Sequence, residues 1–141
     1  MLKILLDTNC LMVAAPQRSK YHWLYELLKR GEIRLAVSTE ILMEYDEQLA
    51  SFYSPAFSEN VLRTLINIPE LEEVTVYYKW NLIHHDPDDN KFVDAAIACN
   101  ADLIVTHDGD FKVLVKVGFP TVRHVTLQEF HMLFFGVPMP A

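Results

Sequence analysis

Several acidic side chains have the type and spacing that could bind a divalent metal ion. Asp7 follows a short apolar run, and Asp108 and Asp110 follow another. Glu44 and Asp89 lie in or at the start of segments with helical periodicity. Gathered carboxylates repel one another unless a cation neutralises them. With no cysteine beside them, they suit Mg²⁺ or Mn²⁺, hard ions that also bind the phosphate oxygens of substrates.

The elements that must position these acids alternate along the chain. Short apolar runs predict strands at 4–6, 35–37, 74–76, 103–105 and 121–122. Periodic segments predict helices at 21–30, 41–52 after a cap at Ser38 or Thr39, 58–68, 89–100, 111–117 and 127–135. Strands separated by helices predict an α/β fold with a mainly parallel sheet. Ligands of such sheets bind at the carboxyl ends of the strands, where these acids are expected.

Helix geometry separates the acids near position 90. At about 100° per residue, Asp89 falls near the middle of the inward face that Phe92 and Val93 define, and Asp94 falls about 140° away. We therefore predict Asp89 as a ligand, Asp88 as the helix cap, and Asp94 as a solvated acid or a support for the ligands.

Two of the other acids have plain alternatives. Glu44 lies two turns into its helix, where neither capping nor the helix dipole explains it, so its alternative is an exposed helical glutamate. For Asp7, an ordinary helix cap is the alternative.

Composition bounds the class of protein. The 141 residues are 51% hydrophobic with only 4 Gly and 7 Pro, which indicates one compact domain over 1–141. A net charge of −7 excludes a broad basic face and argues at first sight against nucleic acid, although the five acids above belong to that excess. Cys10 and Cys99 lie in apolar stretches and are expected as free thiols in a reducing cytosol. Neither a signal peptide nor a membrane span is expected, so the prediction is a soluble, cytoplasmic protein.

Four segments, taken in order, resemble the PIN-domain nucleases. They are ILLDTN at 4–9, STEILMEY at 38–45, DDNKFVDAA at 88–96 and ADLIVTHDGD at 101–110. The resemblance covers almost the whole chain and is greatest to toxin components of bacterial and archaeal toxin-antitoxin pairs. It implies a three-layer α/β/α fold with a central parallel sheet, and a Mg²⁺- or Mn²⁺-dependent phosphodiesterase that acts on RNA with one or two ions.

The resemblance also implies roles for individual residues. The family acids match Asp7, Glu44, Asp89 and Asp108, with Asp110 as a further metal ligand. The polar residue after the first acid matches Thr8 or Asn9, and the residue that precedes the fourth acid matches Thr106. Related toxins often place the third acid directly before an Ala-rich helix, which points to Asp94. The spacing back from the turn at 100–102 favours Asp89.

Other side chains are weaker candidates. Four cations are expected near the acidic edge as contacts for the RNA backbone: Arg18, Lys20, Lys91 and Lys112. His84, His85 and Asp86 are predicted to form a loop rather than a transition-metal site, and His107 is either a phosphate contact or a solvent-facing turn residue.

Aromatic side chains are candidates for contacts with a second chain or with bases. Trp23 is a candidate for the interface of a homodimer. Tyr77, Tyr78 and Trp80 are candidates for base stacking, with core packing or an interface as the commoner use. The apolar tail at 134–140 is predicted either to fold back on the domain or to meet a partner.

The resulting hypothesis is an endoribonuclease that uses metal-activated water and leaves a 5′ phosphate and a 3′ hydroxyl. The resemblance implies that it is a toxin held inactive by a small antitoxin. One alternative is a catalytically silent RNA-binding or scaffold domain, which an intact acid set disfavours. Another is a Mg²⁺-dependent phosphatase with Asp7 as nucleophile, which typically needs an acid where Asn9 stands.

Overall fold

A five-stranded parallel sheet forms the centre of the computed structural model, which describes residues 1–84, 86–117 and 120–140. The strands are β1 (Lys3–Leu6), β2 (Arg34–Val37), β3 (Leu71–Glu73), β4 (Leu103–Val105) and β5 (His124–Val125). Their order is β3-β2-β1-β4-β5, and every neighbouring pair is parallel. Leu6 is in register with Val105, so β1 and β4 end side by side at the middle of the sheet.

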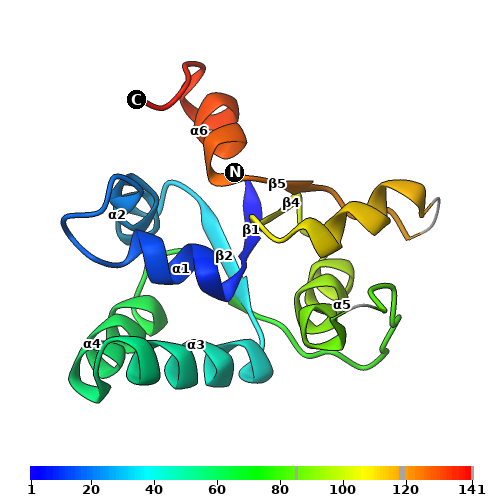
Figure 1. Cartoon of the computed structure of the whole chain (residues 1–141), viewed down its shortest axis with the longest axis horizontal. Helices are drawn as coiled ribbons and strands as arrows, with labels where there is room; N and C mark the ends of the chain where they lie inside the picture. Colours follow the sequence, from blue (N-terminus) through cyan, green and yellow to red (C-terminus); the bar gives the residue numbers. More distant parts are fainter. Residues whose placement is uncertain (85, 118–119, 141) are drawn as a thin grey trace.

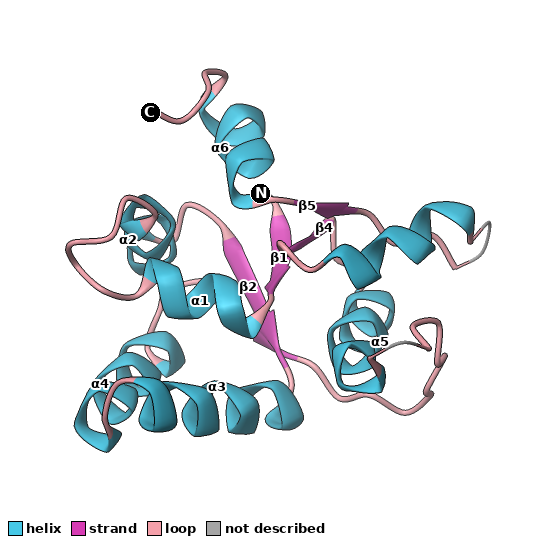
Figure 2. Ribbon diagram, in the orientation of Figure 1, coloured by secondary structure: helices cyan, strands magenta, loops and turns pink. Residues whose placement is uncertain are grey.

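Helices cover both faces of the sheet. They are α1 (Thr8–Ala14), α2 (His22–Arg30), α3 (Thr39–Phe52), α4 (Pro55–Ile66), α5 (Asn90–Cys99) and α6 (Leu127–Phe135), with 3₁₀ helices η1 (Pro87–Asp89) and η2 (Gly109–Lys116). Helices α1 to α4 lie on one side of the sheet and α5 on the other, as Figure 1 shows. Figure 2 shows the strands between these two layers. The predicted three-layer α/β/α sandwich is confirmed.

Burial explains the central strands. Ile4, Leu5 and Leu6 of β1 are fully buried, as is most of β2 and β4, because helices cover both faces. The Tyr45 hydroxyl on α3 donates a hydrogen bond to the carbonyl of Leu6. This contact fixes α3, and with it Glu44, against the end of β1.

The third strand lies at 71–73 rather than at the predicted 74–76. It is an edge strand. Its Glu72 accepts a hydrogen bond from Nζ of Lys3, a β1 residue, at 3.1 Å. Charged side chains are typical of an edge, so an apolar run was the wrong signal for it. The fifth strand lies at 124–125 and not at the predicted 121–122. At 124–125 it pairs with Ile104 and Val105 of β4.

Helix boundaries also differ from the prediction at several places. Helix α1 was missed, because it begins directly after Asp7 in a segment that carries no amphipathic repeat. Helix α4 begins at Pro55 rather than at 58, since Ser54 accepts a hydrogen bond from Phe57 N and proline suits a first helical turn. The helix predicted at 111–117 is the 3₁₀ helix η2.

Two further findings bear on the protein's environment. Among the residues that the structure describes, no helix is long and apolar enough to cross a membrane. Cys10 and Cys99 are both free thiols, as predicted.

Candidate metal centre

The acids gather where the strand order changes direction. Strands β1 and β4 are neighbours in space although two strands separate them in sequence, and such a switch point is the usual ligand site of an open parallel sheet. Asp7 follows β1 directly, and its backbone N–H donates to the Val105 carbonyl at 3.0 Å. Thr106 and Asp108 follow β4. The fold thereby brings residues about 100 positions apart to one edge.

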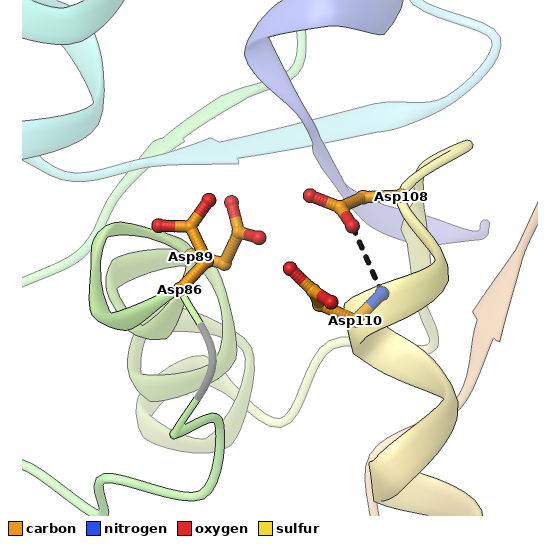
Figure 3. Close-up of side chains that lie close together, drawn as sticks. All are labelled: Asp86, Asp89, Asp108 and Asp110. Carbon is orange, nitrogen blue, oxygen red and sulfur yellow. Dashed lines mark hydrogen bonds between the residues drawn. The ribbon is translucent and has the colours of Figure 1, made fainter.

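Four carboxylates face one another at this edge. Asp86, Asp89, Asp108 and Asp110 each place an oxygen so that all four oxygens lie within 4.8 Å of one another. Figure 3 shows Asp86 and Asp89 extending from the start of the α5 segment toward Asp108 and Asp110 at the start of η2. This is a donor set of oxygen atoms alone, at a separation that a single ion can bridge.

Local turns set the direction of these side chains. Asp86 Oδ1 accepts from Asp88 N at 3.2 Å and begins η1, and Asp108 Oδ1 accepts from Asp110 N at 2.9 Å and begins η2 (Figure 3). Thr106 Oγ1 accepts from Asp108 N at 3.0 Å, which fixes the turn after β4. Each turn leaves carboxylate oxygens directed into the space between the two segments.

The electrostatics indicate a site built for a cation. Asp89 is only 8% exposed, and burial, a hydrogen bond shared with Asp108 and the charges of Asp108, Asp7 and Asp86 raise its pKa to about 8. Within the described residues, Asp89 Oδ2 is buried without a hydrogen-bond partner. Since a buried oxygen without a partner is costly, the oxygen-only set with an orphaned atom fits Mg²⁺ or Mn²⁺.

Asp7 lies beside this group rather than within it. Its side chain is buried, and Oδ2 accepts a hydrogen bond from Thr106 Oγ1 at 2.8 Å. Burial raises the pKa of Asp7 and the Thr106 bond lowers it, while the negative charges of Asp108 and Glu44 raise it again. Asp7 makes no side-chain capping bond to α1, so the alternative of an ordinary cap fails.

Glu44 lies near Asp7, whose pKa its charge raises, and both of its carboxylate oxygens are engaged. Thr8 Oγ1 donates to Oε2, and Lys91 Nζ lies 2.7 Å from Oε1. Glu44 is therefore not an exposed helical glutamate. It is also absent from the group of four oxygens, in contrast to Asp110, the predicted extra ligand, which is within that group.

Of the two roles predicted for Asp94, its contacts are those of a support for the ligands and not those of a solvated acid. It is only 5% exposed, and its Oδ1 accepts the backbone N–H of Trp80 at 3.0 Å. Asn90 holds the same loop by bonding both the N–H and the carbonyl of Ile83, at 2.9 and 2.8 Å. Asp94 and Asn90 thus attach the chain segment before η1 to α5, which supports Asp86 and Asp89 from outside the acidic group.

The sequence analysis missed Asp86, which was assigned to a loop with His84 and His85. His85 lies outside the described residues. Asp86, not Asp88, is the residue that caps the turn, because proline at position 87 suits the first helical position. An aspartate before a proline at a predicted helix start was the signal that could have found it.

The predicted RNA-contacting cations fall into two groups. Arg18, Lys20 and Lys112 are exposed, whereas Lys91 is paired with Glu44. Lys20 Nζ lies 5.2 Å from the centre of the Tyr21 ring, and that ring meets the His107 ring edge-on at 6.2 Å. The loop between α1 and α2 therefore reaches the turn that carries Asp108.

The remaining polar candidates near this edge are exposed. Asn9 is exposed at the surface. His107 is exposed too, and its Nε2 accepts the backbone N–H of Leu127 at 3.1 Å, so it is a structural turn residue.

The aromatic candidates divide between packing and exposure. Trp23 stacks on Phe130 of α6 with ring centres 6.2 Å apart. Tyr77 and Tyr78 are exposed. At the end of α6 the backbone carbonyl of Val137 lies 2.8 Å from His131 Nδ1, while most of the tail at 134–140 is exposed.

Comparison with known proteins agrees with this arrangement. The family described as "PIN domain" matches residues 3–110. No curated protein matches the chain in sequence.

Three solved structures share the fold. VapBC2 from Rickettsia felis bound to a promoter DNA fragment has a TM-score of 0.60 at 19% identity, over 89% of this chain and 98% of that one. DNA-bound VapBC from Salmonella typhimurium has a TM-score of 0.60 at 18% identity, over 90% of this chain and 99% of that one. VapBC-1 from nontypeable Haemophilus influenzae has a TM-score of 0.56 at 15% identity, over 89% of this chain and 98% of that one. With the family match over most of its length and the acids at the switch point of its sheet, the chain belongs to the PIN-domain family.

Proposed function

We propose that the chain is a Mg²⁺- or Mn²⁺-dependent endoribonuclease that hydrolyses phosphodiester bonds. The observation that carries this proposal is the group of four carboxylates within 4.8 Å, which includes the buried, unpartnered Asp89 Oδ2. Membership of the PIN-domain family supports it. Unused carboxylates in such contact would destabilise the protein, so a scaffold function explains them less well.

The acidic residues would have two roles, binding the ion and accepting a proton. Asp89 and Asp108 would hold one ion, with Asp86 and Asp110 within reach. When bound, a divalent ion lowers the pKa of water and stabilises charge on the phosphate. Asp7 lies beside this group, close enough to feel the charge of Asp108, and, held by Thr106, would accept the proton that the attacking water loses. The expected products are a 5′ phosphate and a 3′ hydroxyl.

The RNA would be held mainly by the ion and a few cations. Lys20, Arg18 and Lys112 are exposed, and Lys20 approaches the turn of Asp108 through Tyr21 and His107. Since the chain carries a net charge of −7, we expect weak, salt-sensitive binding of RNA by the protein alone. The proposed place of action is the cytoplasm, where RNA and free thiols coexist.

A small antitoxin is the proposed partner. The three solved structures that share the fold are VapBC proteins, two of them in complexes with DNA. By analogy, the chain would be the toxin of such a pair, and a homodimer is the proposed assembly. Size-exclusion chromatography with light scattering tests the dimer, and co-purification with the product of the adjacent gene tests the antitoxin.

Cleavage of labelled RNA tests the activity. The full chain is incubated with Mn²⁺ or with EDTA, beside Asp89→Asn, Asp7→Asn and a control, Glu47→Gln, which removes an exposed carboxylate from the helix of Glu44. We expect cleavage with Mn²⁺ by the wild type and the control alone. Cleavage that survives EDTA, or that both aspartate variants retain, would contradict the proposal. Phosphate release from small phosphoesters without RNA cleavage would indicate a phosphatase instead.

A further inference from the structure

Lys91 occupies an unusual position beside the acidic group. It is the second residue of α5, two residues after Asp89, and its Nζ lies 2.7 Å from Glu44 Oε1. The Lys91 side chain is only 12% exposed and that of Glu44 only 24%. A lysine this sheltered usually has a definite partner, because burying an unpaired ammonium is costly.

With the Lys91 contact, each carboxylate oxygen of Glu44 has a polar partner. Its other oxygen accepts from Thr8 Oγ1, and Thr8 follows Asp7 directly, so the Glu44–Lys91 pair adjoins the acidic group. Asp89 Oδ2 is unpartnered within the described residues, whereas both oxygens of Glu44 are bonded. The edge of the sheet is thus divided into an oxygen set that needs a cation and a carboxylate that already has one.

A second divalent ion at Glu44 would have to displace this ammonium. Charge-assisted contacts of 2.7 Å are among the stronger polar contacts in proteins, and breaking one leaves a sheltered charge unpaired. An ammonium and a divalent ion can also play the same part at a phosphate, since both place positive charge on its oxygens.

We propose that Lys91 takes the place of a second metal ion: its ammonium neutralises Glu44, limits the site to one divalent ion, and contacts the scissile phosphate. This inference rests on the proposed nuclease function. It specifies which positive charges, one metal ion and one ammonium, the site of that function uses. The ammonium has three N–H donors, and Glu44 accepts one of them. Lys91 also lines a polar pocket of about 230 Å³ with Lys79, Asp88 and Asn90. None of the four clustered aspartates lines this pocket, so it shows only that Lys91 can be reached from solvent beside that group.

Metal stoichiometry tests the inference without reference to activity. Calorimetric titration of the full chain with Mn²⁺ should give one ion for the wild type and two for Lys91→Met, because Glu44 is then free to bind the second. Lys91→Arg and the double variant Lys91→Met with Glu44→Gln should each give one. Circular dichroism checks folding, and Lys91→Gln replaces Lys91→Met if the latter does not fold.

The outcomes separate the two proposals. Two ions in the wild type, or one in a folded Lys91→Met, would overturn the role of Lys91 and leave the nuclease proposal standing. No Mn²⁺ binding by any variant would overturn both.

Cleavage assays give a second readout. At low Mn²⁺, Lys91→Met should cut RNA about 100-fold more slowly, the usual effect of losing one donor to a developing charge. Millimolar Mn²⁺ should restore part of that loss, because the second ion then takes the place of the ammonium. Wild-type rates in Lys91→Met at low Mn²⁺ would overturn the proposed phosphate contact.

Discussion

Replacing Asp89 by asparagine should stabilise the metal-free protein, and more so as the pH rises. In the folded chain the pKa of Asp89 is about 8 against an ordinary value of 3.8, chiefly because the carboxyl is buried. A carboxyl whose pKa is raised on folding contributes stability that is fully present below its unfolded pKa and is lost as the pH rises through its folded pKa. The window for Asp89 therefore runs from about pH 4 to about pH 8. Asparagine cannot ionise, so it removes this dependence.

The size of the effect follows from the same two values. Each pKa unit corresponds to about 1.4 kcal/mol, and at pH 7 slightly more than three units separate the ambient pH from the unfolded pKa. Keeping Asp89 protonated in the folded chain, when the unfolded chain would release the proton, thus costs at most about 4 kcal/mol at pH 7. The pKa of Asp7 is raised as well, so a smaller slope of the same sign should remain in the variant.

Urea unfolding in EDTA at pH 5, 6, 7 and 8 measures the difference. We expect Asp89→Asn to exceed the wild type in free energy of unfolding by about 2 kcal/mol near pH 5, and this difference to grow by a few kcal/mol up to pH 8. Asp88→Asn, an exposed neighbour in the same turn, is the matched control and should show no such gain. The reasoning is refuted if Asp89→Asn is no more stable than the wild type at pH 8, or if their difference does not change with pH.

Two further substitutions probe the support of the site and the grip on RNA. Thr106→Val removes the hydroxyl that donates to the carboxylate of Asp7 and accepts the Asp108 N–H. It should lower the free energy of unfolding in urea by about 1–3 kcal/mol, and Thr106→Ser should lower it less. An equal loss in both variants would contradict this role. Lys20→Gln should weaken RNA binding and reduce the salt slope by about one in filter-binding titrations with EDTA, and an unchanged slope would remove Lys20 from the RNA contacts.

The buried parts of the fold were the predictable parts. β1, β2 and β4 are short apolar runs covered on both faces, and their order along the chain implied where Asp7 and Asp108 would meet. Edge strand β3 was misplaced because it carries two glutamates, of which Glu72 pairs with Lys3 and Arg34, so no apolar pattern marks it.

The site was predictable only where one residue's local position decides its role. The facing argument identified Asp89, but the direction of Asp86 depends on an Asx turn. Helix geometry left Asp94 open between a solvated acid and a support, because it carries no information about the Trp80 loop whose N–H Asp94 accepts. Lys91 and Glu44 are 47 positions apart, and their contact depends on how α3 and α5 pack. Pairings of this kind require the three-dimensional arrangement.

The central claim is that the acidic group between η1 and η2 is a divalent-metal centre. Anomalous diffraction from crystals grown with Mn²⁺ tests it most directly. We expect one peak per chain, about 2 Å from oxygens of Asp89 and Asp108, with Asp89 Oδ2 among the ligands. A crystal that holds Mn²⁺ only elsewhere, or that shows no peak at this edge of the sheet at millimolar Mn²⁺, would contradict the account.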